Sequence, residues 1–174
     1  ATQSAARSWS SQDFIILTGQ LSHKPDQQEI FKKYFTNSLT IPLIHLDSSQ
    51  HFFNQKSYFI LFNHQAGASI TDSNRLYWYN RLLELEKLDT IQNVIMVFPG
   101  DSHTTQFVKD RLLPRMYVLT DKHFYLFVTQ AEERNQILQS DQNVTITPIT
   151  QHEAGQKYLE IEIEGNQVRI TPEF

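Results

Sequence analysis

The hydrophobic positions of the chain form short continuous runs separated by longer amphipathic stripes. The runs at 13–18, 57–63 and 93–98 are apolar enough, and short enough, to be buried strands. The stripes predict three helices, over 24–36, 73–88 and 102–113. Because such strands alternating with helices are typical of parallel strands covered by helices, we expect 14–18, 58–63 and 94–98 in one sheet. The pattern therefore predicts an α/β fold.

The helix over 73–88 has the richest apolar face. We expect its core-facing side chains to be Leu76, Tyr79, Leu82 and Leu83, with Trp78 as a further candidate. Asp72 or Ser73 can cap its first turn by accepting from the unpaired N–H groups there. Upstream, 39–46 is predicted to be extended, and Pro42 restricts it to an edge strand or an irregular approach.

The segment after Pro114 is predicted to be a hairpin. Pro114 is expected to end the helix over 102–113, and 116–128 then folds back at Asp121-Lys122. A weak helix over 131–139 and a weak strand over 143–149 follow.

The C-terminus carries the clearest local pattern. Leu159, Ile161 and Ile163 alternate with glutamates, which indicates a strand with one apolar face. Gly165-Asn166 then supplies a tight turn with glycine at its first central position, as type II′ requires. This register sets Ile163 opposite Val168 and Glu162 opposite Arg169. We expect the apolar face of this hairpin to dock on the domain's own sheet or helices and the glutamate face to be solvated.

Composition limits the possible classes of protein. A chain of 174 residues with 40% hydrophobic and 12% aromatic content is most simply one globular domain. We expect a flexible N-terminus over 1–12, a folded domain over 13–140 and a β extension over 141–174 packed on that domain. The net charge of −4 gives no reason to expect nucleic acid as a partner. No apolar run reaches the roughly 18 residues that a transmembrane helix needs.

Cysteine is absent from the chain. A disulfide framework, a thiolate zinc site and a cysteine nucleophile are therefore excluded for this sequence. The chain begins Ala-Thr-Gln-Ser-Ala-Ala without methionine, which fits either a mature end left by signal-peptide cleavage or a boundary chosen for expression. This favours a secreted or periplasmic protein slightly over a cytoplasmic one.

Three segments carry a resemblance to a known fold. Residues 41–49 read Ile-Pro-Leu-Ile-His-Leu-Asp-Ser-Ser, 59–62 read Phe-Ile-Leu-Phe before a loop and a leucine-rich helix, and 113–121 read Leu-Pro-Arg-Met-Tyr-Val-Leu-Thr-Asp. In this order they resemble the incoming strand, the active-site strand and the strand after the cis-proline of the thioredoxin-like fold, in its peroxiredoxin and thiol-disulfide interchange branch. The resemblance runs from about Asp13 to Gln139. It implies a thioredoxin-like central mixed sheet flanked by helices, with the C-terminal β-hairpin added.

The resemblance also implies positions for a degenerate redox loop. Ala66 and Ser69 stand where the two cysteines of the family would fall, and Pro114 is the candidate cis-proline beside that loop. Without thiols these residues cannot perform thiol chemistry. An ordinary flexible turn over 66–69 is the alternative interpretation.

Asp101-Ser102-His103 places three residue types of hydrolytic enzymes side by side. A serine hydrolase needs such groups to converge in space, and adjacency in sequence does not provide that. Ser102 and His103 are candidate hydrolase residues, whereas Asp101 or Ser102 as a helix N-cap is the alternative that we favour.

The remaining candidates are weaker. His45 and His51 flank a loop that contains Asp47, so a metal site is possible there, whereas solvated or core-satisfied histidines are the alternative that we favour. The cluster Tyr77-Trp78-Tyr79 can expose part of its aromatic surface to a protein partner, whereas ordinary packing of these aromatic side chains is the alternative that we favour. Asn143-Val-Thr145 matches an N-glycosylation acceptor.

These observations favour a protein-binding or structural module without redox turnover and without a metal or other cofactor. One alternative is a thiol-disulfide oxidoreductase or thiol peroxidase whose cysteines are lost or substituted. A second is a serine hydrolase that uses Ser102. We expect the partner to be another protein.

Overall fold

The computed structural model describes seven stretches of the chain. They are residues 15–17, 43–45, 49–54, 56–62, 69–129, 138–149 and 158–173. The predicted loose segment 1–12, the predicted helix 24–36 and most of the predicted helix 131–139 lie outside these stretches. The chain forms two compact units, of which the larger consists of Ser49–Thr150 together with Glu164–Gln167.

A five-stranded mixed sheet is the centre of the larger unit. Its strands follow one another in chain order, β3-β4-β5-β6-β7. They span β3 (Gln50–Asn54), β4 (Ser57–Leu61), β5 (Asn93–Pro99), β6 (His123–Thr129) and β7 (Val144–Ile149). β3 is antiparallel to β4, and every other neighbouring pair is parallel. All residues of β4 and β5 are buried, which confirms the two apolar runs as buried strands.

The first apolar run does not belong to this sheet, so the prediction of one sheet for all three runs is wrong. β1 (Ile15–Leu17) pairs in parallel with β2 (Leu43–His45), and the two form a separate two-stranded sheet. β3 occupies the place beside β4, with Phe52 opposite Phe59. A short apolar run indicates that a strand is buried but carries no information about its neighbour, which explains the error.

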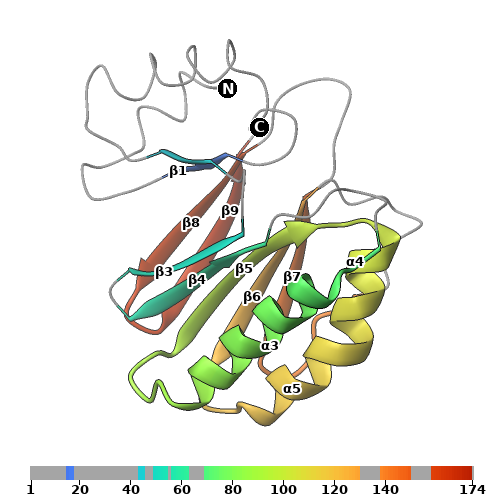
Figure 1. Cartoon of the computed structure of the whole chain (residues 1–174). Coiled ribbons are helices and arrows are strands. Elements are labelled where there is room, and N and C mark those ends of the chain that lie inside the picture. The colour runs from blue at the N-terminus through green and yellow to red at the C-terminus, as the bar shows by residue number, and fades with distance from the viewer. Residues whose placement is uncertain are drawn as a thin grey trace. The chain divides into compact units, whose positions relative to one another are not determined.

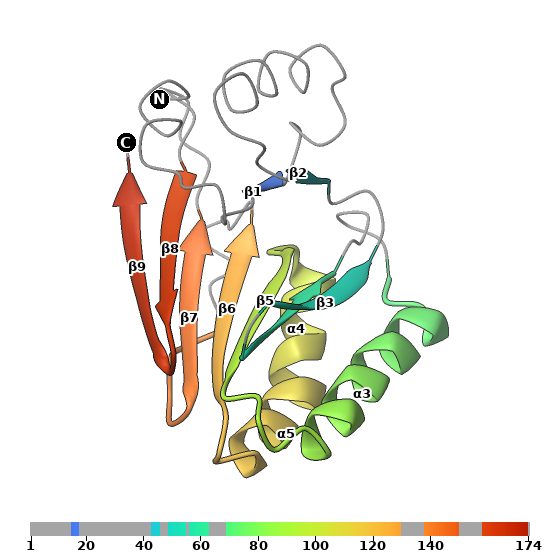
Figure 2. The same ribbon diagram turned by 90° about the vertical axis from the view of Figure 1, so that its left-hand side faces the viewer.

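The helices of the larger unit lie on one face of its sheet (Figures 1 and 2). α3 (Asp72–Glu86) connects β4 to β5, while α4 (Ser102–Phe107), a π-helical turn η2 (Val108–Leu112) and α5 (Leu113–Val118) connect β5 to β6. Because crossovers between parallel strands are almost always right-handed, strands added in one direction carry their helices on one face. Tyr58, Val94 and Phe124 lie in one row across the sheet and belong to the core beneath these helices.

The prediction for the core face of α3 is right in part. Leu82 and the further candidate Trp78 are buried, and Tyr79 is partly buried against the core. Leu76 and Leu83 are 60% and 48% exposed, and Leu85 is buried in their place. Trp78, Leu82 and Leu85 have the i, i+4, i+7 spacing of one helix side, so periodicity alone could not exclude them as the buried set. The predicted caps are also wrong, because Thr71 precedes the helix and its hydroxyl accepts from the backbone N–H of Asn74 at 3.1 Å.

The predicted hairpin over 116–128 is wrong, and the helix does not end before Pro114. Pro114 lies in the first turn of α5, immediately after the π-helical turn η2. A proline is tolerated in a first turn because its missing N–H has no partner to lose there. Residues up to Val118 are therefore helical, and the turn at Asp121 leads into β6, which is parallel to β5.

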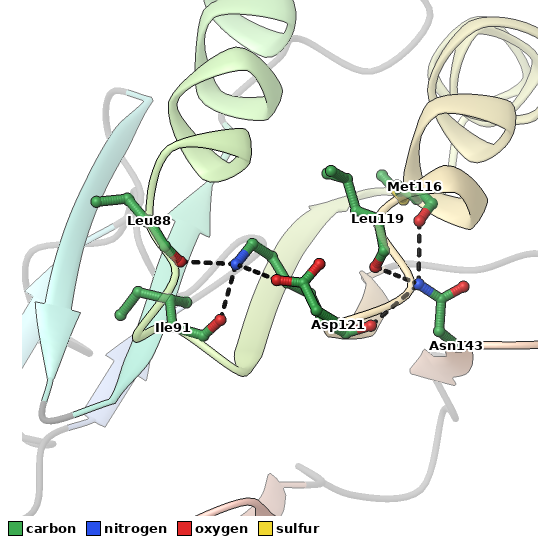
Figure 3. A network of polar contacts seen from close by, with 7 residues as sticks. Leu88, Ile91, Met116, Leu119, Asp121 and Asn143 are labelled. Atoms are coloured by element: carbon green, nitrogen blue, oxygen red, sulfur yellow. Dashed lines mark hydrogen bonds and ion pairs between the residues drawn. The ribbon is translucent and has the colours of Figure 1, made fainter.

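Two polar side chains hold the connections at the amino ends of the parallel strands (Figure 3). Lys122 Nζ donates to the carbonyl oxygens of Leu88 at 2.7 Å and Ile91 at 2.9 Å, and lies 3.3 Å from the carboxylate of Asp121. The side-chain amide of Asn143 donates to three backbone carbonyls. These are the carbonyls of Met116, Leu119 and Lys122, at 3.0, 2.9 and 3.0 Å. The side chains thus tie the end of α3, the end of α5 and the start of β7 to one another.

The predicted C-terminal hairpin is confirmed. β8 (Tyr158–Glu164) and β9 (Gln167–Glu173) form a two-stranded sheet, and Arg169 lies 3.4 Å from the carboxylate of Glu162. Gly165 has a φ of +62° while Asn166 does not have a positive φ, which fits a type II′ turn and excludes type I′. The turn belongs to the larger unit, in which the side-chain amide of Asn93 donates to the carbonyl oxygen of Gly165 at 2.7 Å.

Candidate functional site

The residues predicted for a degenerate redox loop are not brought together among the described residues. Ala66 lies outside them, and Ser69 is exposed ahead of the N-terminus of α3. Pro114 lies within the helical layer, in α5. The peptide bond before it is trans, like every other described peptide bond, so the candidate cis-proline is a wrong prediction.

Ser102 and His103 lie in the first turn of α4, and both are exposed. The N-cap of this helix is Asp101, whose carboxylate accepts from the backbone N–H of Thr104 at 3.0 Å and from its hydroxyl at 2.7 Å. Both carboxylate oxygens are therefore engaged in capping and do not orient an imidazole. Of the two residues predicted as the N-cap, Asp101 is the one that caps the helix. Among the described residues, the side chain of Ser102 forms no hydrogen bond with a histidine.

A cluster that sequence reasoning did not identify joins the edge strand β3 to α3. We call it the His51 cluster, and it consists of His51, Tyr58, Tyr77, Arg81 and Glu84. His51 Nδ1 lies 3.2 Å from the hydroxyl of Tyr77, and Arg81 Nη1 makes a close contact with His51 Nε2. Since a guanidinium only donates, Nε2 accepts and Nδ1 carries the proton that it donates to Tyr77.

The other half of the cluster lies deeper. The Tyr58 hydroxyl donates to Glu84 Oε2 at 2.8 Å, and Arg81 forms an ion pair with the same carboxylate oxygen at 3.5 Å. The guanidinium of Arg81 also lies 5.4 Å from the centre of the Tyr77 ring, within the range of a cation–π contact. The Arg81–Glu84 ion pair is thus partly buried, with Tyr77 beside the cation and Tyr58 beside the carboxylate.

The cluster favours the uncharged form of His51, Tyr58 and Tyr77. Burial lowers the pKa of His51, and the adjacent Arg81 cation lowers it further. Burial raises the pKa of Tyr77 to about 12, and burial together with the hydrogen bond to Glu84 raises the pKa of Tyr58. At neutral pH the imidazole and both phenols are therefore uncharged. Because both nitrogens of His51 are engaged, the imidazole has no free position to act as a base or a metal ligand.

The sequence contains a partial signal for this cluster. Tyr77, Arg81 and Glu84 have the i, i+4, i+7 spacing of one helix side. The pairing of β3 with β4, which places His51 opposite Ile60, was not predicted and supplies the rest. The metal site considered at His45 and His51 includes Asp47, which lies outside the described residues. The described residues themselves contain no group of three metal-ligating side chains.

A second feature is an apolar stripe on the outer side of α3. It consists of Leu76, Tyr79 and Leu83, which have the i, i+3, i+7 spacing of one helix side. The guanidinium of Arg115, in α5, lies 4.7 Å from the centre of the Tyr79 ring. We call these four residues, with Arg111 one turn before Arg115, the α3–α5 surface.

No family model, no curated protein and no solved structure matches this chain. No helix within the described residues has the length and apolar character needed to cross a membrane. The candidate functions therefore depend on the two features above.

Proposed function

We propose that the larger unit of this protein is a protein-binding module and that it binds through the α3–α5 surface. The observation that carries the proposal is the exposure of two leucines on one stripe of α3, 60% for Leu76 and 48% for Leu83. Only two other large hydrophobic side chains in the described part of the chain, Phe53 and Val118, are comparably exposed. Exposed apolar side chains gathered on one element are typical of interaction sites.

The composition of the stripe supports the same conclusion. Protein interfaces are enriched in tyrosine and arginine, and hot-spot residues are drawn largely from these types. Tyr79 packs edge-on against Phe107, with ring centres 6.1 Å apart, while Arg115 covers its face. Both side chains are thereby held in place before a partner arrives, which lowers the entropic cost of binding.

The absence of cysteine supports binding over redox turnover, because the nucleophile of disulfide chemistry is a thiolate. The engagement of Asp101 in the cap of α4 gives the serine hydrolase alternative no support. The proposal depends on the surface and not on the thioredoxin-like resemblance, which stays a prediction.

A selection from a displayed peptide library against the full chain tests the proposal. Enriched peptides are synthesised, and their affinities are measured by fluorescence anisotropy for the unchanged protein, the double variant Leu76→Gln/Leu83→Gln and the control Lys56→Gln. Each leucine is already half-buried, so completing its burial contributes about 1 kcal/mol, and the double variant should bind roughly 30-fold more weakly.

Lys56 is exposed and belongs to the turn before β4, so its substitution should not change the affinity. The proposal is wrong if no peptide is enriched. It is also wrong if the double variant, with unchanged circular dichroism and unfolding midpoint, binds as tightly as the unchanged protein.

A further inference from the structure

The helical connection that packs beside α3 is mostly basic. The helical connection Ser102–Val118 carries Lys109, Arg111 and Arg115 against a single carboxylate, Asp110. Asp110 Oδ2 already accepts a hydrogen bond from the side chain of Gln106 at 2.8 Å. The chain as a whole has a net charge of −4, so this basic cluster runs against the overall charge.

Neither arginine of the α3–α5 surface has an acidic partner among the residues that the structure describes. Arg111 and Arg115 are both exposed, and neither takes part in a described ion pair. On α3, by contrast, Arg75 pairs with Asp72 at 3.6 Å and Arg81 pairs with Glu84 at 3.5 Å. Arg111, in η2, and Arg115, in α5, are therefore both available to an incoming carboxylate.

The apolar part of the surface has the geometry of one helix stripe. Leu76, Tyr79 and Leu83 extend over two turns, which matches the two-turn spacing of anchors on an amphipathic partner helix. α3 and α5 lie side by side on the same face of the sheet (Figures 1 and 2), and Arg115 reaches the ring of Tyr79. A helix that lies on the stripe therefore has its flank beside the two arginines.

We propose that the α3–α5 surface binds an acidic amphipathic helix of another protein. Apolar side chains of that helix cover Leu76, Tyr79 and Leu83, and carboxylates on its flank pair with Arg111 and Arg115. Arginine suits this role because its planar group binds a carboxylate with two hydrogen bonds while stacking on an aromatic face. This inference rests on the proposed protein-binding function and adds the chemical class of the partner.

The test uses a displayed library of helical peptides in which leucine or phenylalanine is fixed at i, i+3 and i+7 and every other position is random. We expect Asp and Glu to be enriched on one flank of the selected helices. Binding of a selected peptide to Arg111→Gln/Arg115→Gln should weaken about tenfold, with a smaller dependence on salt than for the unchanged protein. Lys56→Gln removes the same kind of charge elsewhere and should have no effect.

The outcomes separate this inference from the proposed function. If the leucine double variant loses binding but the arginine double variant does not, or if no acidic residues are enriched, the partner class is wrong and the binding surface stands. If neither variant loses binding, the proposed function itself is wrong. The inference is also overturned if the protein co-sediments with vesicles of phosphatidylglycerol, the arginine double variant does not, and the selected peptides fail to compete with the vesicles. That result would assign the surface to a membrane.

Discussion

Lys122 provides the most direct test of how the amino ends of the parallel strands are held. Its side chain is 1% exposed, whereas that of the neighbouring Asp121 is 61% exposed. The ammonium group donates to the carbonyls of Leu88 and Ile91, which belong to the connection between α3 and β5. The substitution Lys122→Met keeps most of the aliphatic stem and removes every donor.

The expected loss in the free energy of unfolding depends on which hydrogen-bond donors remain for the two carbonyl oxygens. Leu88 O still accepts from the backbone N–H of Ile91 at 3.2 Å, whereas the described residues offer Ile91 O no second donor. A buried acceptor without a donor costs about 1–3 kcal/mol, and each hydrogen bond from a charged donor contributes about 1.5–3 kcal/mol. Removing the ammonium also removes its desolvation penalty, so we expect a net loss of about 2 kcal/mol in the free energy of unfolding.

Urea unfolding followed by tryptophan fluorescence measures this loss, because Trp78 is fully buried in the same unit. For a unit of about 100 residues the matching fall in Tm is roughly 8–16 °C. Lys56→Met is the matched control at an exposed lysine and should change the free energy of unfolding by less than about 0.5 kcal/mol. A value for Lys122→Met within the same margin of the unchanged protein would refute the role given to the ammonium group.

Three further predictions concern single side chains. Asp101→Ala should lower the free energy of unfolding by about 1–2 kcal/mol, because the backbone N–H and the hydroxyl of Thr104 both lose their acceptor. Ser102→Ala should lower it by less than about 0.5 kcal/mol. Equal losses for the two variants in urea unfolding would contradict the cap assignment. Asn93→Ala should cost about 1–3 kcal/mol and speed amide hydrogen exchange in the turn around Gly165, and unchanged exchange there would show that the turn does not depend on this bond. Because the pKa of His51 is lowered in the folded state, the unfolded chain binds more protons below about pH 6.5, and the free energy of unfolding should fall as the pH drops through that range. In unfolding experiments between pH 7 and 5, His51→Gln should flatten this pH dependence. A pH profile as steep as that of the unchanged protein would exclude His51 as the source of the dependence.

The sequence predicted the buried strands of the larger unit well. Continuous apolar runs such as 93–98 have no polar face to place in solvent, so burial on both sides of a sheet follows directly. The C-terminal hairpin was predicted with its register, because the apolar alternation, the glycine turn and the Glu162–Arg169 pair all specify the same alignment. These are local patterns whose meaning does not depend on distant parts of the chain.

The errors arose where distant contacts decide between local alternatives. α3 carries two apolar stripes, and only the packing of Trp78 against Phe62 and Phe98 shows which one is buried. Residues 115–118 contain β-prone side chains, yet Met116 is fully buried and the segment continues a helix. The spacing within α3 indicates only the helical half of the His51 cluster, because His51 lies 26 positions before Tyr77 and joins it through the pairing of β3 with β4.

The engagement of Asn143 has a consequence for producing the protein. Its side-chain nitrogen, which donates to three backbone carbonyls, is also the atom to which a glycan would be attached in the acceptor sequence Asn143-Val-Thr145. The hydroxyl of Thr145, the other required residue, lies 2.7 Å from Nε2 of His123. Glycosylation of Asn143 and the folded arrangement of this turn are therefore mutually exclusive. In a host that glycosylates nascent chains in its secretory pathway, glycosylation of Asn143 therefore competes with folding. Chains that carry a glycan at this position cannot form all three hydrogen bonds.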